Sequence, residues 1–288
     1  MKQFALIGDP LGHSLSPSLH KAIYRQLEID DASYRAIELN QDKLSGFFQG
    51  MRAGGFDGVN VTIPHKSAVI DALDDIDPPA RLLNAVNCIH QVHGTLVGYN
   101  TDVLGFAHSL ASNQIDIEGN VFAILGAGGS AQAVAAVLAQ GNAQTVYLVN
   151  RSQQRAQALS GLIQSMNAQV SAIVCEADAL NEVGSTLSGI VNTTPVGMSP
   201  AITESPLTLN KAIAHDGLAV VDLIYTPSQT QLLQEAESLG AKAINGMEML
   251  VAPAVYSVEI WLGGNVVSHV DMSSLVRELE RRLVQKSG

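Results

Sequence analysis

Short runs of apolar and β-branched residues alternate along this chain with longer segments whose apolar residues recur at helical spacing. The short runs predict strands at residues 4–7, 33–38, 58–62, 85–90, 121–125, 145–149, 170–174, 189–192, 220–223 and 242–244. The longer segments predict helices at residues 16–27, 43–53, 132–140, 153–165, 229–239 and 273–284. Such alternation is typical of parallel sheets covered by helices on both faces, so the pattern predicts an α/β protein.

The pattern restarts once, near residue 102, where GYNTDVLGF is followed by a helical segment, a polar turn and a new strand. From there to about residue 246 the strands and helices form a self-contained nucleotide-binding unit of the Rossmann type. The residues after it are mostly helical and bring no strand with them. We therefore expect two domains, residues 1–102 completed by the helices of 247–288, and residues 103–246, with a cleft between them.

Charge and cysteine content narrow the choice of partners and compartment. The formal net charge of −11 argues against nonspecific binding to nucleic acid or anionic membranes, because both need a positive field. No window approaches the roughly 18 uninterrupted apolar residues of a membrane helix. The apolar stretch that follows Met1 is also too short for a signal peptide. The two cysteines, Cys88 and Cys175, lie far apart and suit a reducing compartment, so we expect a soluble cytoplasmic protein.

A glycine-rich segment, VFAILGAGGSAQA, carries the strongest local signal. Its strand ends at Leu125, and Gly126, Gly128 and Ala131 then fill the three small-residue places of the dinucleotide fingerprint. They allow a tight turn, a close approach of backbone to the pyrophosphate, and close packing of helix on strand. A glycine-rich turn without a ligand is the alternative. We assign to the cofactor site the residues Gly126, Ala127, Gly128, Gly129, Ser130 and Ala131.

The end of the next strand, TVYLVNRSQQR, indicates which nucleotide binds. NAD-specific sites usually carry an acidic residue there, for the ribose 2′-hydroxyl, whereas this chain has Asn150. Arg151 and Ser152 follow, and Arg155 lies one helical turn beyond Arg151. Because a guanidinium binds phosphate through charge-assisted hydrogen bonds, the pattern predicts NADP. Solvation on an exposed surface is the alternative for the two arginines.

Polar residues gather at the strand ends of the first domain, where an α/β sheet places its ligand. They are Ser14 and Ser16 after the first strand, Asn60, Thr62 and Lys66 in GVNVTIPHK, Asn87, which ends or follows the fourth strand, and Asp102 in NTD. Helix capping would explain one of the two serines. Taken singly, a lysine such as Lys66 is most often a solvated surface residue, and Asp102 is most often a helix cap.

Six motifs occur in one order along essentially the whole chain: SLSPSLH, VNVTIPHK, AVNCIHQVHGTLVGYNTD, GAGGSAQA, NRS and VNTTPVGM. In this order and spacing the chain resembles the shikimate dehydrogenase family, of the shikimate/quinate 5-dehydrogenase type. The resemblance implies an NADP-dependent enzyme of aromatic amino acid biosynthesis that reversibly reduces 3-dehydroshikimate to shikimate. It also implies that the first domain binds the substrate, on a mainly parallel sheet, and that the Rossmann domain binds NADP.

The resemblance further implies roles for single residues. Ser14 and Ser16 would bind the substrate carboxylate, and Tyr225 would close over the substrate. Facing the ring hydroxyls and the reacting oxygen would be Thr62, Lys66, Asn87 and Asp102. We add Asn60 to the substrate site, and Thr193 and Gly246 to the cofactor site.

The residue types suit this chemistry. The oxygen of a carbonyl that accepts hydride needs a proton, which Lys66 can donate while Asp102 holds it in place. We expect no metal, because the eight histidines form no ligand-spaced cluster with cysteine or carboxylate. His13, His20 and His65 lie near the predicted site, and we interpret them as structural or supporting residues.

One position departs from the family pattern. Where the family has a glutamine that hydrogen-bonds the substrate, NGMEMLVAPAVYS has Pro253, which offers no amide and would kink a helix. Three interpretations stay open: a shikimate dehydrogenase, a related enzyme acting on quinate or another cyclic hydroxy acid, and a non-catalytic NADP-binding regulator. The intact Lys66 and Asp102 argue against the regulator. The oligomeric state also stays open, with a homodimer as one option.

Overall fold

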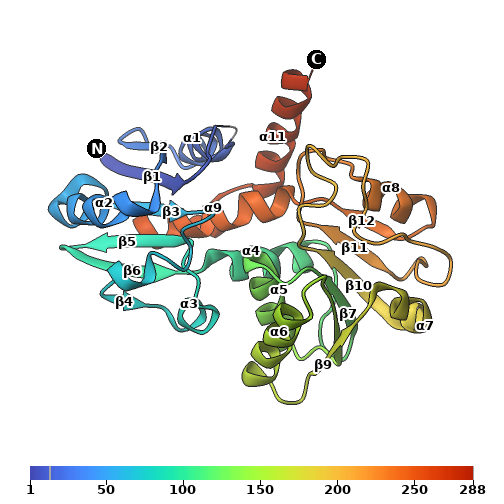
Figure 1. The fold of residues 1–288 in the computed structure, drawn as a ribbon. Coiled ribbons are helices and arrows are strands. Elements are labelled where there is room, and N and C mark those ends of the chain that lie inside the picture. The colour runs from blue at the N-terminus through green and yellow to red at the C-terminus, as the bar shows by residue number, and fades with distance from the viewer. Residues whose placement is uncertain (13, 288) are drawn as a thin grey trace. The chain divides into compact units, whose positions relative to one another are not determined.

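The computed structural model of the protein describes residues 1–12 and 14–287. Over these residues the chain divides into two compact units, residues 1–105 with those from 250 onward, and residues 106–249. Each unit contains one six-stranded β-sheet among its described residues, with helices packed on it (Figure 1). The prediction of an α/β fold is confirmed.

The sheet of the first unit has the strand order β2-β1-β3-β5-β6-β4. Its strands are β1 (Lys2–Gly8), β2 (Ala32–Glu38), β3 (Gly58–Val61), β4 (Asp75–Ile76), β5 (Cys88–Val92) and β6 (Thr95–Tyr99). Strand β1 pairs in parallel with β2 and β3, and β4 pairs in parallel with β6, whereas β5 is antiparallel to both of its neighbours. The predicted mainly parallel sheet is therefore confirmed, with an antiparallel β5–β6 hairpin inserted.

The hairpin and the short strand β4 are the parts of this sheet that the sequence pattern missed. We expected a single strand over residues 85–90, whereas β5 begins at Cys88 and the chain then returns as β6. The turn between them is His93–Gly94, and both residues have positive φ (51° and 85°). Such a two-residue turn matches the right-handed twist of a hairpin.

Helices of both chain ends cover this sheet. They are α1 (Ser16–Gln26), α2 (Leu44–Gly50), the π-helical turn η2 (Met51–Gly55), α3 (Pro78–Leu83), α10 (Val266–His269) and α11 (Met272–Ser287). The first turn of α4 (Thr101–Ser112) and residues 250–262 of α9 (Met247–Leu262) also belong to this unit. Helix α9 continues through Pro253. Two 3-10 turns, η1 (Gln41–Lys43) and η3 (Ile70–Ala72), complete the connections.

Trp261 holds helix α9 against the middle of the sheet. Its ring stacks on Phe4 of β1, with centroids 4.6 Å apart, and its Nε1 donates to the Ile89 carbonyl at 3.0 Å. The indole lies over Gly58 of β3, where an added Cβ would come within 2.3 Å of Nε1. Only a glycine lets this strand and the indole approach so closely.

The second unit has the strand order β12-β11-β10-β7-β8-β9, with every pair parallel among the described residues. This is the order of a doubly wound dinucleotide-binding fold, so the predicted Rossmann architecture is confirmed. The strands are β7 (Val121–Leu125), β8 (Thr145–Val149), β9 (Ser171–Cys175), β10 (Leu187–Asn192), β11 (Ala219–Asp222) and β12 (Lys242–Ile244). The helices are α5 (Gly129–Gln140), α6 (Gln153–Met166), α7 (Leu180–Val183) and α8 (Gln231–Ser238), with 3-10 turns η4 (Ala177–Ala179) and η5 (Gly184–Thr186).

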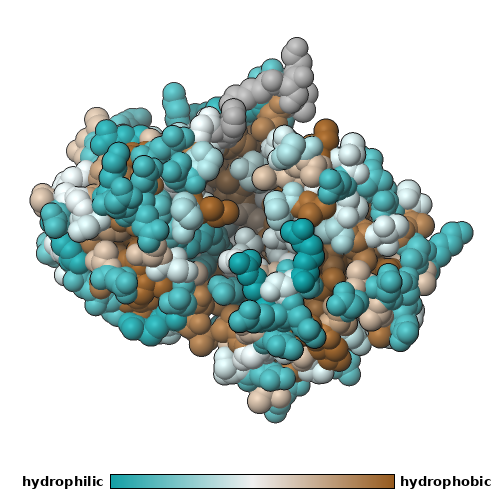
Figure 2. Space-filling model, viewed as in Figure 1, coloured by the Kyte–Doolittle hydropathy of each residue, from teal (hydrophilic) through white to brown (hydrophobic). Residues whose placement is uncertain are grey.

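The visible surface of each unit is mixed in polarity. Figure 2 shows hydrophobic residues in brown scattered among hydrophilic residues in teal. No helix in the described part of the chain is both long and apolar enough to cross a membrane.

Replacing Gly58 by alanine tests the contact with Trp261. We expect Gly58→Ala to lower the free energy of unfolding by about 1–3 kcal/mol, because the indole is held on two sides and cannot withdraw. Urea denaturation measures this. Gly46 of α2 is the matched control, since an added Cβ there meets no described atom within 4 Å. Gly46→Ala should raise stability by roughly 0.5–1 kcal/mol, and equal effects at both sites would contradict the packing argument.

Candidate active site

Lys66 and Asp102 form an ion pair in the first unit. Lys66 lies in the loop after β3, and Asp102 lies in the first turn of α4. The Lys66 Nζ is 2.6 Å from Asp102 Oδ2, and the two side chains are 24% and 16% exposed. The pair is thus sheltered yet open to a small molecule. The alternative of a cap does not hold for Asp102, because Asn100 Oδ1 accepts the Asp102 N–H at 3.1 Å.

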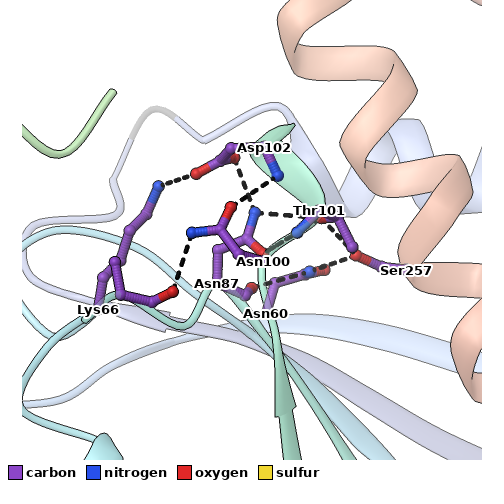
Figure 3. Close-up of polar contacts among 8 residues, drawn as sticks. Asn60, Lys66, Asn87, Asn100, Thr101, Asp102 and Ser257 are labelled. Carbon is purple, nitrogen blue, oxygen red and sulfur yellow. Dashed lines mark hydrogen bonds and ion pairs between the residues drawn. The ribbon is translucent and has the colours of Figure 1, made fainter. Parts of the chain in front are cut away.

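Asn87 joins this pair to the end of the sheet (Figure 3). Its Nδ2 donates to Asp102 Oδ1 at 2.7 Å, and its Oδ1 accepts the backbone N–H of Thr101 at 2.7 Å. Because that N–H can only donate, the amide is fixed with its nitrogen toward Asp102. The neighbouring Val86 N–H donates to the Lys66 carbonyl at 2.8 Å. Strand β5 and helix α4 therefore determine where both charged groups lie.

Asn60 lies beneath Asn87, and its amide bonds protein groups on both sides. Its Nδ2 donates to the Asn87 carbonyl at 3.2 Å and to Ser257 Oγ at 2.8 Å. Its Oδ1 accepts the Tyr34 hydroxyl at 2.9 Å. These contacts support the orientation of Asn87; direct contact of Asn60 with substrate stays a prediction.

The hydroxyls predicted to bind substrate lie on two loops of the same unit. Ser14 Oγ accepts the Ser16 N–H at 3.3 Å, and Ser16 begins α1. The N-cap of that helix is Leu15, so capping does not explain Ser16. Thr62 packs its methyl group against Gly8, where an added Cβ would lie 2.5 Å from it. These three side chains are half-buried and not enclosed, and their contact with substrate stays a prediction.

Two of the three histidines that we interpreted as structural are fully enclosed, and His13 lies outside the described residues. His65 is 1% exposed, and its Nε2 is 2.5 Å from the Leu39 carbonyl, which anchors the loop that carries Lys66. His20 is 0% exposed and stacks on Tyr34, with ring centroids 3.6 Å apart. Burial lowers the pKa of His20 to about 3, so its ring is uncharged at neutral pH.

The glycine loop of the second unit follows β7 and opens α5. Gly126 has a φ of +107°, and an added Cβ would lie 2.5 Å from Thr193 Oγ1. Gly128 is the N-cap of α5, and a Cβ on it or on Gly129 would meet no described atom within 4 Å. Ala131 is fully buried. The helix therefore presents its first N–H groups to open space, as an anion-binding loop requires.

The two arginines that we assigned to the nucleotide follow β8, which pairs with β7. Asn150 Nδ2 donates to the Ser152 carbonyl at 2.8 Å, and Ser152 is the N-cap of α6, accepting the Arg155 N–H. Arg151 and Arg155 are exposed, and neither guanidinium forms an ion pair or a hydrogen bond with the described residues. Both are free to take an anionic ligand.

The ends of β10 and β11 bring further predicted residues to the same edge. Thr193 Oγ1 donates to the Leu125 carbonyl at 2.8 Å. The Gly246 N–H donates to the Ile224 carbonyl at 3.0 Å, and an added Cβ on Gly246 would lie 2.0 Å from the Leu223 oxygen. Tyr225 is half-buried, and burial raises the pKa of its phenol, which keeps it protonated.

Sequence reasoning missed the residues that support these sites from below. Thr101 and Ser257 are fully buried under Asn87, and Asp222 is fully buried under the β10 and β11 ends. Asp222 accepts from Asn192 Nδ2 at 2.9 Å and from Thr230 Oγ1 at 2.7 Å. A carboxylate directly after the apolar run LAVV was the one available signal for it.

Comparison with known proteins gives the same family for both units. Residues 6–89 match the model of the shikimate dehydrogenase substrate binding domain, and residues 109–224 match that of shikimate / quinate 5-dehydrogenase. The chain is 41% identical over 261 residues to shikimate dehydrogenase (NADP(+)) from Halothermothrix orenii, which covers 90% of each protein.

Two solved structures show the range of this fold. Shikimate 5-dehydrogenase from Listeria monocytogenes, in complex with shikimate and NAD, superposes with a TM-score of 0.89 at 29% identity, covering 97% of this chain and 96% of that one. The ligand-free 5-ketofructose reductase of a Gluconobacter strain superposes with a TM-score of 0.86 at 30% identity, covering 97% and 98%.

The buried, uncharged His20 makes stability depend on pH. In the unfolded chain a histidine titrates near ~6.5, so the unfolded state takes up a proton on acidification while the folded state does not. The pKa of His20 is lower in the folded state than in the unfolded state. Stability is therefore lost as the pH falls below the pKa of histidine in the unfolded chain. This one group should cost about 2 kcal/mol between pH 7 and pH 5. His20→Phe keeps the stacked ring and should reduce the pH-dependent loss by that amount in urea denaturation at both pH values; unchanged pH dependence would contradict this.

Proposed function

Because this chain belongs to the shikimate dehydrogenase family, we propose that it reversibly reduces 3-dehydroshikimate to shikimate with NADPH. The observation that carries the proposal is the Lys66–Asp102 ion pair, held at 2.6 Å with Asn87 on the second carboxylate oxygen. An NADP-dependent oxidoreductase of the shikimate pathway needs such a proton donor at the reacting oxygen.

We assign the substrate to the first unit and NADP to the second. The cofactor fits the residues present, since the Gly128–Gly129 turn leaves open space in front of the α5 N-terminus. Arg151 and Arg155 would bind the 2′-phosphate. Asn150 is uncharged, so it would not repel this phosphate as an acidic residue at the same position would. When bound, NADPH supplies the hydride that reduces the carbonyl carbon.

The protein's own part in the reaction is to place and move a proton. The Lys66 ammonium donates a proton from Nζ to the carbonyl oxygen as that oxygen gains negative charge, and accepts one from the hydroxyl in the reverse direction. Asp102 Oδ2 holds Nζ at 2.6 Å. Asn87 Nδ2 keeps Oδ1 of the same carboxylate in place at 2.7 Å, so the lysine faces one direction.

Serine and threonine hydroxyls give the site its selectivity for a hydroxylated ring that carries a carboxylate. The hydroxyls of Ser14 and Ser16 would donate hydrogen bonds to the substrate carboxylate. Thr62 would form a hydrogen bond with a ring hydroxyl. Tyr225 of the second unit stays protonated because burial raises its pKa, so its phenol is a hydrogen-bond donor. The compartment belongs to the same proposal: Cys88 and Cys175 are unpaired thiols, which suits a reducing cytoplasm.

Pro253 supports a second candidate, the reduction of another polyhydroxylated carbonyl compound such as dehydroquinate. The ring packs against Gly105 of α4, whose added Cβ would lie 2.4 Å from the proline Cγ. No amide is therefore available where the family pattern supplies one to the substrate. The likeness to a 5-ketofructose reductase supports this candidate, because that fold relative bears the name of a different substrate. The intact Lys66–Asp102 pair speaks against a non-catalytic regulator.

Turnover with a panel of acids tests the proposal. Shikimate and quinate are offered with NADP and with NAD, and NADPH or NADH formation is followed by absorbance. We expect shikimate with NADP to be the best pair. Lys66→Met should lower kcat by about 10²–10⁴-fold with little change in KM, because only the proton donor is lost.

Lys43→Met is the matched control, since Lys43 is an exposed lysine of the same unit. It should leave kcat unchanged. Turnover of quinate but not shikimate would favour the second candidate, and no turnover of either acid despite NADPH binding would overturn the proposal.

Arg151 tests the cofactor assignment. Arg151→Ala should raise the KM for NADP by roughly 10- to 100-fold, because one charge-assisted bond to the phosphate is lost. The KM for NAD, which carries no 2′-phosphate, should hardly change, and the two cofactors together serve as an internal control. An equal rise for both cofactors would show that Arg151 acts on something other than the 2′-phosphate.

A further inference from the structure

A buried chain of hydroxyl and amide groups runs from helix α9 to the catalytic pair. Thr101 and Ser257 are both 0% exposed, and Asn87 is 6% exposed. Figure 3 shows them in sequence, with Ser257 on the helix, Thr101 beside it, and Asn87 reaching Asp102. The proposed proton transfer uses Lys66 and Asp102 directly and makes no use of the two hydroxyls.

Donor and acceptor capacities give this chain a direction. Ser257 Oγ donates its one proton to the Pro253 carbonyl at 2.8 Å, which can only accept. Ser257 Oγ must therefore accept from its other neighbours, Asn60 Nδ2 at 2.8 Å and Thr101 Oγ1 at 3.3 Å. If the Thr101 proton points to Ser257, its lone pairs point to Asn87 Nδ2 at 3.1 Å.

Asn87 then uses both amide protons, one on Thr101 and one on Asp102. Its Oδ1 is already occupied by the Thr101 N–H at 2.7 Å. Without an acceptor at position 257, the Thr101 proton would turn to Asn87 Oδ1, which lies 3.2 Å away. That turn points the Thr101 proton toward the amide from which Thr101 Oγ1 otherwise accepts, so the contact with Asn87 Nδ2 loses its alignment. The loss of Ser257 Oγ also takes the acceptor from one half-buried proton of Asn60 Nδ2. Unpaired buried donors are costly, so the amide would shift.

We propose that Ser257 is a positioning residue for the reaction, acting through Thr101 and Asn87 to fix the carboxylate of Asp102. The inference rests on the proposed function, because it concerns the same catalytic pair. Ser257 reaches Thr101 because Pro253, one turn earlier, packs on Gly105, one turn after Thr101. The close approach of α9 and α4 at this proline thus sets the distance between the two hydroxyls.

Kinetics of single and double variants test the chain. Ser257→Ala and Thr101→Val each remove one hydroxyl at nearly constant shape. Each should lower kcat by roughly 10- to 100-fold while the KM values for shikimate and NADP change little, because alignment and not affinity is lost. The double variant should lose no more than the worse single variant, since both changes break one chain. Multiplying effects, or a wild-type kcat in Ser257→Ala, would overturn the proposal.

A half-buried hydroxyl elsewhere in the first unit separates positioning from stability. Ser33 Oγ of β2 donates to Gln3 Oε1 at 2.9 Å, away from the catalytic pair. Ser33→Ala should lower stability to urea and leave kcat unchanged. If Ser257→Ala did the same, its role would be structural alone.

Hydrogen exchange gives a readout that needs no substrate. The Thr101 N–H is held by Asn87 Oδ1, so its exchange in Ser257→Ala should be at least about 10-fold faster than in the wild type if Asn87 is loosened. Unchanged protection would overturn the proposal. Should the wild type fail to oxidise shikimate, the proposed function falls, while exchange at Thr101 still decides whether Ser257 orders Asn87.

Discussion

The side-chain amide of Asn87 is the constraint on which the first unit's chemistry depends. It joins the start of β5 to the first turn of α4, and it is oriented by a backbone N–H that can only donate. Its nitrogen is therefore committed to Asp102, which in turn holds Lys66. A carboxylate and an ammonium from residues 36 apart in sequence thus meet directly, and an uncharged side chain holds the carboxylate in place.

The sequence predicts the elements with strong periodicity and misses those that depend on tertiary pairing. Strands β7, β8 and β12 begin and end where the apolar runs do. The sequence does not predict strand β6, because the apolar run in TLVGY is interrupted by glycine, and pairing with β5 makes the segment a strand. The hairpin signal, His93–Gly94, is weaker than the Asn-Gly or Asp-Gly pairs that usually mark such turns.

Site residues follow the same division. The glycine loop has a local cause in the positive φ of Gly126 and the open helix start, so a short motif predicts it. Only the resemblance to the family distinguishes Lys66 and Asp102 from a surface lysine and a helix cap, because no local sequence feature shows that the two side chains meet. Ser257 left no signal at all. A serine in an apolar helix commonly bonds a carbonyl of its own helix, as Ser257 does with Pro253. Nothing in the sequence shows that Ser257 also accepts from partners about 150–200 residues away.

Pro253 makes two separate contributions at one position of helix α9. Its contribution to the fold lies in a ring that fits against Gly105 and a carbonyl that accepts from Ser257. The carbonyl is a backbone group that any residue supplies, and helix α9 continues through the proline. The side chain at this position can therefore change without removing the acceptor on which the buried chain ends. The side chain and the backbone of this residue thus contribute separately, because the ring packs on Gly105 whereas the carbonyl binds Ser257.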